Sequence, residues 1–222
     1  MPIRIDERLT AIATLIKGGT VADVGCDHGK LGYYLVSTDR ADRVIATDIS
    51  APSLQKAQEL AFDNGVSHIM ETRLGDGLSP IMSDEADTVV IAGLGGDVMA
   101  EILSSARHEG KTFKHFVLSP NTHPEKVRRE LSLSNHTIVT DNLTECAGKY
   151  YTIISTELNL GYKETLDDDQ IFFGKFFATD EVFVKRTREE ISTMKNILES
   201  HKSPALEEKI AKYEAILEKV KL

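Results

Sequence analysis

The chain has 222 residues, 41% of them hydrophobic, and carries a formal net charge of -9 at pH 7. This length suits one α/β domain of about 150 residues with an appended segment, and the apolar content is sufficient for a buried core. The acidic charge argues against binding of nucleic acid through bulk electrostatics, although it does not exclude a local basic face.

No stretch approaches the roughly 18 consecutive apolar residues of a membrane span, and no basic and then apolar leader opens the chain. We therefore expect a cytoplasmic protein that makes no membrane contact. Cys26 and Cys146 are the only cysteines, which argues against a disulfide framework and favours reduced thiols.

Short apolar or β-branched runs alternate with segments of helical periodicity along the first half of the chain. This alternation is typical of a parallel sheet covered by helices. Ser50 is the expected N-cap of the helix after the second run, with Pro52 in its first turn and Asn64 and Gly65 at its end. The five runs that we predict as strands are residues 20–25, 43–49, 68–74, 87–92 and 113–118.

Two further strands are predicted at residues 136–141 and 150–158, with residues 142–149 as the loop between them. Their proximity allows antiparallel pairing, which a purely parallel nucleotide-binding fold does not predict. The expected fold class is thus α/β, with a Rossmann-like sheet that is mainly parallel and has an antiparallel last strand, an arrangement that fits a methyltransferase sheet.

The character of the sequence changes near residue 160, so we expect an α/β domain at 1–160 and a helical domain at 161–222. A break at Ser203 and Pro204 separates two segments with apolar residues at heptad spacing, which predicts an antiparallel coiled-coil hairpin. The alternative is that these helices pack back on the α/β domain. The spaced residues are Val184, Ile191, Met194 and Leu198, then Leu206, Ile210, Tyr213, Leu217 and Val220.

A glycine turn follows the first predicted strand, with Gly25, Asp27 and Gly29 in the run Val24-Gly25-Cys26-Asp27-His28-Gly29. A dinucleotide site requires G-x-G-x-x-G, in which the middle glycine lets the backbone approach a pyrophosphate. Asp27 takes that middle position, where its carboxylate repels phosphate but suits a cation. S-adenosylmethionine carries a sulfonium and an ammonium and no phosphate, so the turn predicts a methyl donor.

Acidic and glycine residues also follow the next three strands. Asp48 is expected to accept the ribose hydroxyls and Asp76 to bond the adenine amine, although each also suits a turn or a helix cap, as does His28. The glycine run after the fourth strand has no following Lys-Ser or Lys-Thr, which disfavours a phosphate cradle. The predicted donor-binding residues are Gly25, Asp27, His28, Gly29, Asp48, Ile49, Asp76, Gly77, Ala92, Gly93 and Gly95.

The turn Ser119-Pro120-Asn121-Thr122 follows the fifth strand, and there Asn121 offers one acceptor and two donors near the expected transfer point. Alternatively, Asn121 or Thr122 caps the next helix. We take Asp27 and Asn121 as the catalytic candidates. The candidate substrate-binding residues are Gly96, Pro120, Lys126, Arg128, Arg129, Tyr150 and Tyr151.

The basic residues of that set, with Lys111, Lys114 and His115, form a candidate basic face, unless they are only solvated helix faces. The seven histidines are scattered and neither cysteine has a partner two residues away, so we expect no metal site. No serine lies in a Gly-x-Ser-x-Gly elbow, so serine hydrolase chemistry is also unsupported.

With these motifs in view, the chain resembles the bacterial TrmK family of tRNA (adenine-22-N1)-methyltransferases over nearly its whole length. The resemblance implies a class I S-adenosylmethionine-dependent fold with a C-terminal coiled coil, and a tRNA substrate methylated on adenine N1 in the D-arm region. Ser119 stands where the family turn often has Gln. The matching segments are Asp23-Val24-Gly25-Cys26-Asp27-His28-Gly29, Thr47-Asp48-Ile49-Ser50, Gly75-Asp76-Gly77-Leu78, Ile91-Ala92-Gly93-Leu94-Gly95-Gly96, Pro120-Asn121 and Gly148-Lys149-Tyr150-Tyr151.

Two other functions are weighed against this one. A non-enzymatic RNA-binding or assembly module could retain the cofactor pocket as structure, with the hairpin as a partner surface. A nicotinamide-dependent oxidoreductase is disfavoured by Asp27 and by the missing G-x-G-x-x-G pattern. The oligomeric state, monomer or weak dimer, stays open at this stage.

Overall fold

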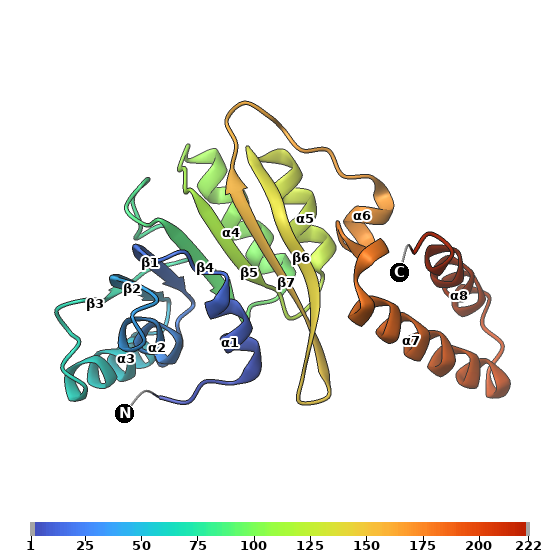
Figure 1. Ribbon diagram of the computed structural model, residues 1–222, viewed down its shortest axis with the longest axis horizontal. Helices are drawn as coiled ribbons and strands as arrows, with labels where there is room; N and C mark the ends of the chain where they lie inside the picture. Colours follow the sequence, from blue (N-terminus) through green and yellow to red (C-terminus); the bar gives the residue numbers. More distant parts are fainter. Residues whose placement is uncertain (1–2, 221–222) are drawn as a thin grey trace.

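The computed structural model describes residues 3–220 and contains a seven-stranded sheet with the strand order β3-β2-β1-β4-β5-β7-β6 (Figure 1). The first five strands run parallel, and β7 is antiparallel to both of its neighbours. The predicted fold class is therefore confirmed. The strands are β1 (Thr20–Val24), β2 (Arg43–Asp48), β3 (Met70–Leu74), β4 (Thr88–Ala92), β5 (His115–Ser119), β6 (His136–Cys146) and β7 (Lys149–Leu158).

Helices cover both faces of the sheet. One face packs on α1 (Glu7–Thr14), α2 (Lys30–Ser37) and α3 (Ala51–Asp63), and the other on α4 (Gly96–His108) and α5 (Pro124–Leu133). Alternate residues of one strand feed the two cores, because side chains alternate across a sheet. The loops at the carboxyl ends of the parallel strands stay outside both cores and are free to form a site.

The helix after β2 begins and ends where the sequence predicts. The Ser50 side chain accepts a hydrogen bond from the Ser53 N–H at 3.3 Å, and Pro52 lies in the first turn. Asn64 is the C-cap, so the capping chemistry of the sequence is sufficient to define this element.

The β6–β7 hairpin is longer than predicted. Residues 142–146 belong to β6, and the connection is only Ala147 and Gly148, both at positive φ (49° and 75°). The prediction of a loop over 142–149 is wrong for a tertiary reason. The Leu143 N–H donates to Asp180 Oδ2 at 2.9 Å, and the Leu143 side chain packs on a cluster around Phe177, so residues from the C-terminal segment hold this part of β6 extended.

The C-terminal segment contains α6 (Asp168–Phe173), a short 3-10 helix (Phe177–Thr179), α7 (Glu181–Ser200) and α8 (Pro204–Leu217). Helices α7 and α8 form a hairpin that projects away from the sheet (Figure 1). Ile191 and Met194 of α7 pack against Ile210 of α8, as the heptad spacing predicts. The alternative, in which these helices pack back on the α/β domain, holds only at the base of the hairpin, where Val184 of α7 and Ile216 of α8 belong to a cluster that contacts Leu143 of β6.

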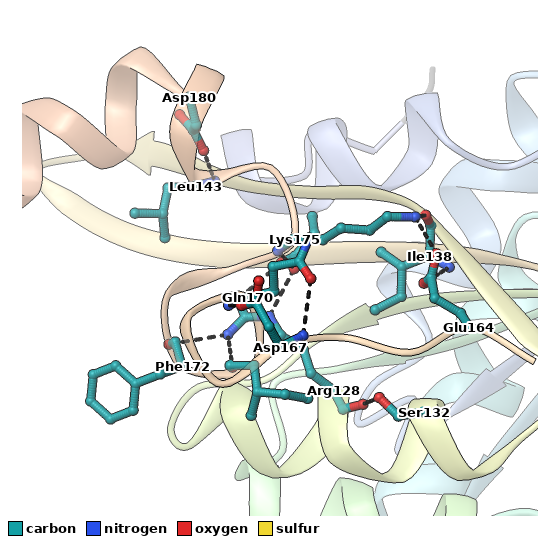
Figure 2. Close-up of polar contacts among 12 residues, drawn as sticks. Arg128, Ser132, Ile138, Leu143, Glu164, Asp167, Gln170, Phe172, Lys175 and Asp180 are labelled. Carbon is teal, nitrogen blue, oxygen red and sulfur yellow. Dashed lines mark hydrogen bonds and ion pairs between the residues drawn. The ribbon is translucent and has the colours of Figure 1, made fainter. Parts of the chain in front are cut away.

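A buried ion pair joins α5 and the sheet to α6, which precedes the helical hairpin. Arg128 on α5 donates two hydrogen bonds to Asp141 on β6, at 2.8 and 2.9 Å, and a third to the Ile171 carbonyl of α6 at 3.0 Å. Asp141 also accepts the Lys175 N–H at 2.6 Å, and the Lys175 ammonium pairs with Glu164 (Figure 2). The side chains of Arg128 and Asp141 are 3% and 1% exposed, so Arg128 cannot reach a tRNA phosphate and its assignment as a substrate-binding residue is wrong.

We expect Arg128→Met to lower the free energy of unfolding by roughly 3–5 kcal/mol, because it leaves the Asp141 carboxylate buried without its cation. Urea unfolding followed by circular dichroism measures this loss. Arg129→Met, on the exposed face of the same helix, is the matched control and should change stability by less than about 0.5 kcal/mol. The double variant Arg128→Met/Asp141→Leu should recover part of the loss. A cost for Arg128→Met as small as that of the control would contradict a structural role for the pair.

Candidate active site

A cavity of about 570 Å³ opens at the carboxyl ends of the parallel strands, where open α/β sheets bind their ligands. Every predicted donor-binding residue lines it except Gly29 and Gly95. The site is therefore built from the loops after β1, β2, β3 and β4, which lie far apart in the sequence and meet at one edge of the sheet.

The turn after β1 is held on the end of β2. The Gly25 and Cys26 N–H groups both donate to the Thr47 carbonyl, at 2.8 and 2.9 Å. Gly29 is in the left-handed region (φ 69°), and a Cβ there would lie 2.7 Å from the Ala57 Cβ. Gly29 thus permits close packing of α2 on α3 instead of lining the cavity.

Asp27 also has a left-handed backbone (φ 50°), a conformation that aspartate tolerates better than most residues. Its side chain is 77% exposed at the rim of the cavity, with Oδ1 3.4 Å from Nε2 of His28. The His28 ring also contacts the Lys56 ammonium at 3.1 Å. His28 does not cap α2, whose N-cap is Gly29 without a side-chain hydrogen bond.

Two backbone donors fix the Asp48 carboxylate. The Asp27 N–H donates to Oδ2 at 3.0 Å, and the Ser50 N–H donates to Oδ1 at 2.8 Å. Each carboxylate oxygen keeps acceptor capacity for a ligand. Beside it, Ile49 is 72% exposed and offers an apolar surface, and Asp76 on the loop after β3 also lines the cavity.

Asp23, at the end of β1, lines the cavity floor, and sequence reasoning did not single it out as a site residue. Burial raises its pKa to about 7, against the lowering effect of the Gly32 N–H, and Asp48 raises it further. Asp23 Oδ2 has no hydrogen-bond partner in the part of the chain that the structure describes. A buried acceptor without a donor, in a cavity rich in carboxylates, fits a cationic ligand such as the ammonium of an amino acid.

On the acceptor side, Asn121 makes three contacts that hold its loop. The Nδ2 group donates to the Gly93 carbonyl at 2.6 Å, the backbone N–H donates to the Leu94 carbonyl at 2.8 Å, and Oδ1 accepts from Arg8 Nη1 at 3.1 Å. The N-cap of α5 is His123, so Asn121 does not cap that helix. Arg8, which no sequence motif marks, lies on α1 with its guanidinium 5.0 Å from the centre of the Tyr151 ring.

Three of the predicted glycine and proline contacts have a packing role. A Cβ on Gly96 would lie 2.2 Å from the His123 carbonyl oxygen, and one on Gly95 would lie 3.3 Å from Thr122 Oγ1. Pro120 is buried. These residues bring the loops after β4 and β5 together. Gly96 and Pro120 are buried, which argues against their predicted contacts with a substrate, whereas Gly95 is half-buried and its donor contact stays a prediction.

A second concave surface, a groove of about 860 Å³, lies between the β6–β7 hairpin and helices α7 and α8. Tyr150 donates its hydroxyl to Glu189 at 2.7 Å, which pins α7 to the tip of the β6–β7 hairpin. Arg8 lines the donor cavity and its partner Asn121 lines the groove, so the two concavities meet at this pair. The groove residues are Asn121, Lys149, Tyr150, Tyr151, Arg186, Glu189, Glu190, Thr193, Met194, Lys209 and Tyr213.

The predicted basic face does not form. Lys126 pairs with Asp97 near the carboxyl end of β5, whereas Lys114 pairs with Asp87 at the opposite end of that strand. His115 is buried, and burial lowers its pKa to about 4. The residues that seemed adjacent along the chain lie at both ends of one strand, and only the exposed ones, such as Lys126 and Arg129, are accessible to a substrate.

Within residues 3–220, no three His, Cys, Asp or Glu side chains are grouped in a way that would hold a metal ion. None of the helices described combines the length and the apolar character needed to cross a membrane. Both cysteines are free and buried.

Comparison with known proteins gives the class. Residues 5–154 match the family model described as a methyltransferase domain. A Streptococcus pneumoniae putative tRNA (m1A22) methyltransferase, solved in complex with S-adenosyl-L-methionine, superimposes with a TM-score of 0.84 at 27% identity, covering 96% of this chain and 100% of that one. Fold and site together define a class I S-adenosylmethionine-dependent methyltransferase.

Two relatives indicate the family within this class of methyltransferases. The tRNA (adenine(22)-N(1))-methyltransferase of Bacillus subtilis is 29% identical over 203 residues, which is 89% of this chain and 85% of the relative. The TrmK structure from M. capricolum, in complex with S-adenosyl-homocysteine, has a TM-score of 0.84 at 25% identity and covers 98% of this chain and 99% of its own. The chain belongs to the TrmK family of tRNA methyltransferases.

We expect the stability of the wild-type protein to fall relative to Asp23→Asn as the pH rises from about 4 to about 7. The unfolded chain releases this proton near pH 3.8 and the folded protein retains it to about pH 7, so deprotonation favours unfolding within that window. The difference in unfolding free energy between the wild-type protein and Asp23→Asn should change by about 4 kcal/mol between pH 4 and pH 7 and stay constant above pH 7. Urea unfolding across this range measures it, with Asp42→Asn, an exposed carboxylate, as the control. A difference independent of pH would contradict a protonated Asp23.

Proposed function

We propose that this chain transfers the methyl group of S-adenosylmethionine to N1 of the adenine at position 22 of tRNA. The observation that carries the proposal is the set of four aspartates around the donor cavity, beside an open groove that begins at Asn121. Carboxylates repel a pyrophosphate and suit a cationic donor. Membership of the TrmK family supports the substrate. The four acids are Asp23, Asp27, Asp48 and Asp76.

The same observation weakens both alternatives. A nicotinamide cofactor would bring its pyrophosphate against Asp27, in a turn that lacks the middle glycine. A non-enzymatic module does not need an orphaned acceptor such as Asp23 Oδ2, whose burial costs stability unless a ligand satisfies it.

The reaction needs placement more than it needs a base. Bound S-adenosylmethionine supplies an electrophilic methyl group on a positively charged sulfur. Adenine N1 carries a lone pair at neutral pH, so it forms the new N–C bond while the C–S bond breaks and its electron pair remains on sulfur. In this proposal Asp48 and Asp76 hold the adenosyl group, Asp23 faces the ammonium, and Asp27 at the rim orients the donor or stabilises the cationic product ring.

The tRNA must present a base edge that is normally paired or stacked. N1 lies on the Watson–Crick edge, so the target base has to be exposed at a cost of a few kcal/mol. The groove offers cations and aromatic rings for the exposed strand, among them Lys149, Arg186 and Lys209 with Tyr150 and Tyr213. We infer that residues 1–160 bind donor and base and that residues 161–222 hold the tRNA body.

We infer that the protein acts in the cytoplasm, together with its proposed tRNA substrate. The two free cysteines suit a reducing compartment. Lys126 and Arg129, both exposed on α5, are further candidates for contacts with tRNA phosphates.

Methylation of an unmodified tRNA transcript with labelled donor, followed by nucleoside analysis, tests the proposed function. We expect N1-methyladenosine as the product and no incorporation when adenine 22 is replaced by guanine. A different methylated nucleoside would retain the fold and refute the substrate. Donor binding by calorimetry without any methylation of tRNA would favour the non-enzymatic module.

We expect Asp27→Asn to lower kcat by roughly 10²–10³-fold while the protein stays folded, because the variant loses the carboxylate charge and keeps a residue that tolerates the left-handed backbone. Asp27→Ala is less informative, since it adds backbone strain at φ 50°. Asp39→Asn, which has a similar φ of 54° and is exposed outside the cavity, is the matched control. Full activity of Asp27→Asn would remove Asp27 from the mechanism.

A further inference from the structure

The side-chain amide of Asn121 donates one hydrogen bond and accepts another, from two different partners. Its Nδ2 donates to the Gly93 carbonyl at 2.6 Å, and its Oδ1 accepts from Arg8 Nη1 at 3.1 Å. Rotating the amide by half a turn would set Oδ1 against a carbonyl oxygen and the NH₂ group against a guanidinium. Both contacts would then be repulsive, so the network itself assigns the position of the amide oxygen.

The position of the Arg8 side chain is fixed by its helix and by an aromatic ring. It lies in the first turn of α1, whose N-cap Asp6 accepts the Leu9 N–H at 2.7 Å. Its guanidinium stacks over Tyr151, with the ring centre 5.0 Å away. A planar group fixed by stacking loses little freedom when it donates a hydrogen bond.

An amide oxygen has two acceptor sites, and Arg8 uses one of them. Arg8 lines the cavity and Asn121 lines the groove, so Oδ1, which is bonded to Arg8, lies where the donor cavity and the groove meet, and its second acceptor site is available to a ligand there. Next to N1 of adenine is the 6-amino group, which is a donor. Guanine carries a carbonyl oxygen at the same place, which would meet the amide oxygen as acceptor against acceptor.

We propose that Arg8 is a positioning residue that fixes the amide of Asn121, so that Oδ1 accepts a hydrogen bond from the 6-amino group of the target adenine. The inference rests on the proposed function and adds the group that selects the base. As N1 gains the methyl group, positive charge spreads over the ring to the 6-amino nitrogen, and its N–H becomes a stronger donor. The hydrogen bond to Asn121 then strengthens in the transition state, which is the condition for it to raise the rate.

The test compares two tRNA transcripts, one with adenine and one with unsubstituted purine at position 22. Purine retains N1 and lacks the 6-amino group. For the wild-type protein we expect purine to lower kcat/KM by roughly 10–100-fold. Part of this penalty is intrinsic, because N1 is a weaker nucleophile without the electron-donating 6-amino group, and it is the same in every variant. In Arg8→Met, which cannot orient the amide, the purine penalty should shrink several-fold toward this intrinsic part, with a lower kcat on adenine.

Three further variants make the comparison specific. Arg8→Lys keeps a donor at that position and should recover part of the discrimination, whereas Asn121→Ala should lose it without any change at Arg8. Arg4→Met, an exposed arginine that precedes α1, is the matched control and should show the wild-type ratio.

An equal purine penalty in wild type and Arg8→Met would overturn the inference. A defect in donor binding would overturn it too. In that case Arg8→Met would bind S-adenosylmethionine more weakly in calorimetry by the same factor by which its kcat/KM falls, and its kcat at saturating donor would be unchanged, because Arg8 would act on the donor. A wild-type protein that leaves adenine 22 unmethylated would instead refute the proposed function.

Discussion

The attachment of one strand end to its neighbour is the constraint on which the site depends. Three consecutive N–H groups after β1 donate to the end of β2: those of Gly25 and Cys26 to the Thr47 carbonyl, and that of Asp27 to the Asp48 carboxylate. Without these donors, several carboxylates around one cavity would repel each other and the loops would separate. With them, the acids stay in place as an anionic pocket, and a cationic donor becomes the natural occupant.

A second buried contact decides where the acceptor side lies. The Arg128–Asp141 pair joins α5, β6 and the start of the C-terminal segment. Asp180 holds the Leu143 backbone a few residues further along β6 (Figure 2). The hairpin of α7 and α8 is thereby set beside the β6–β7 turn, and the groove forms between them. A chain with a net charge of -9 can in this way present a local set of cations and aromatic rings to RNA.

The donor and acceptor sides meet at a pair of residues that are 113 positions apart in the chain, Arg8 and Asn121. Asn121 was predictable because it follows a proline in the turn after a parallel strand, where ligands gather. The role of Arg8 was not predictable, because the sequence around an arginine in an amphipathic N-terminal helix does not indicate which residues it contacts in the fold. The prediction for Arg128 was wrong for the opposite reason. Its charge suggested a contact with phosphate, whereas its side chain is buried in an ion pair with Asp141.

The sequence alone determined the parallel part of the sheet, the caps of α3, the two helices of the hairpin and the class of the donor, since each depends on local periodicity, on turn chemistry or on Asp27 within a glycine pattern. Only the tertiary structure decided which charges are available. The buried state of Asp23, the loss of Arg128 to an internal ion pair and the recruitment of Arg8 all depend on partners brought together by packing. The charge state and the partners of a side chain depend on the groups that surround it in space, and its neighbours in the sequence do not determine these groups.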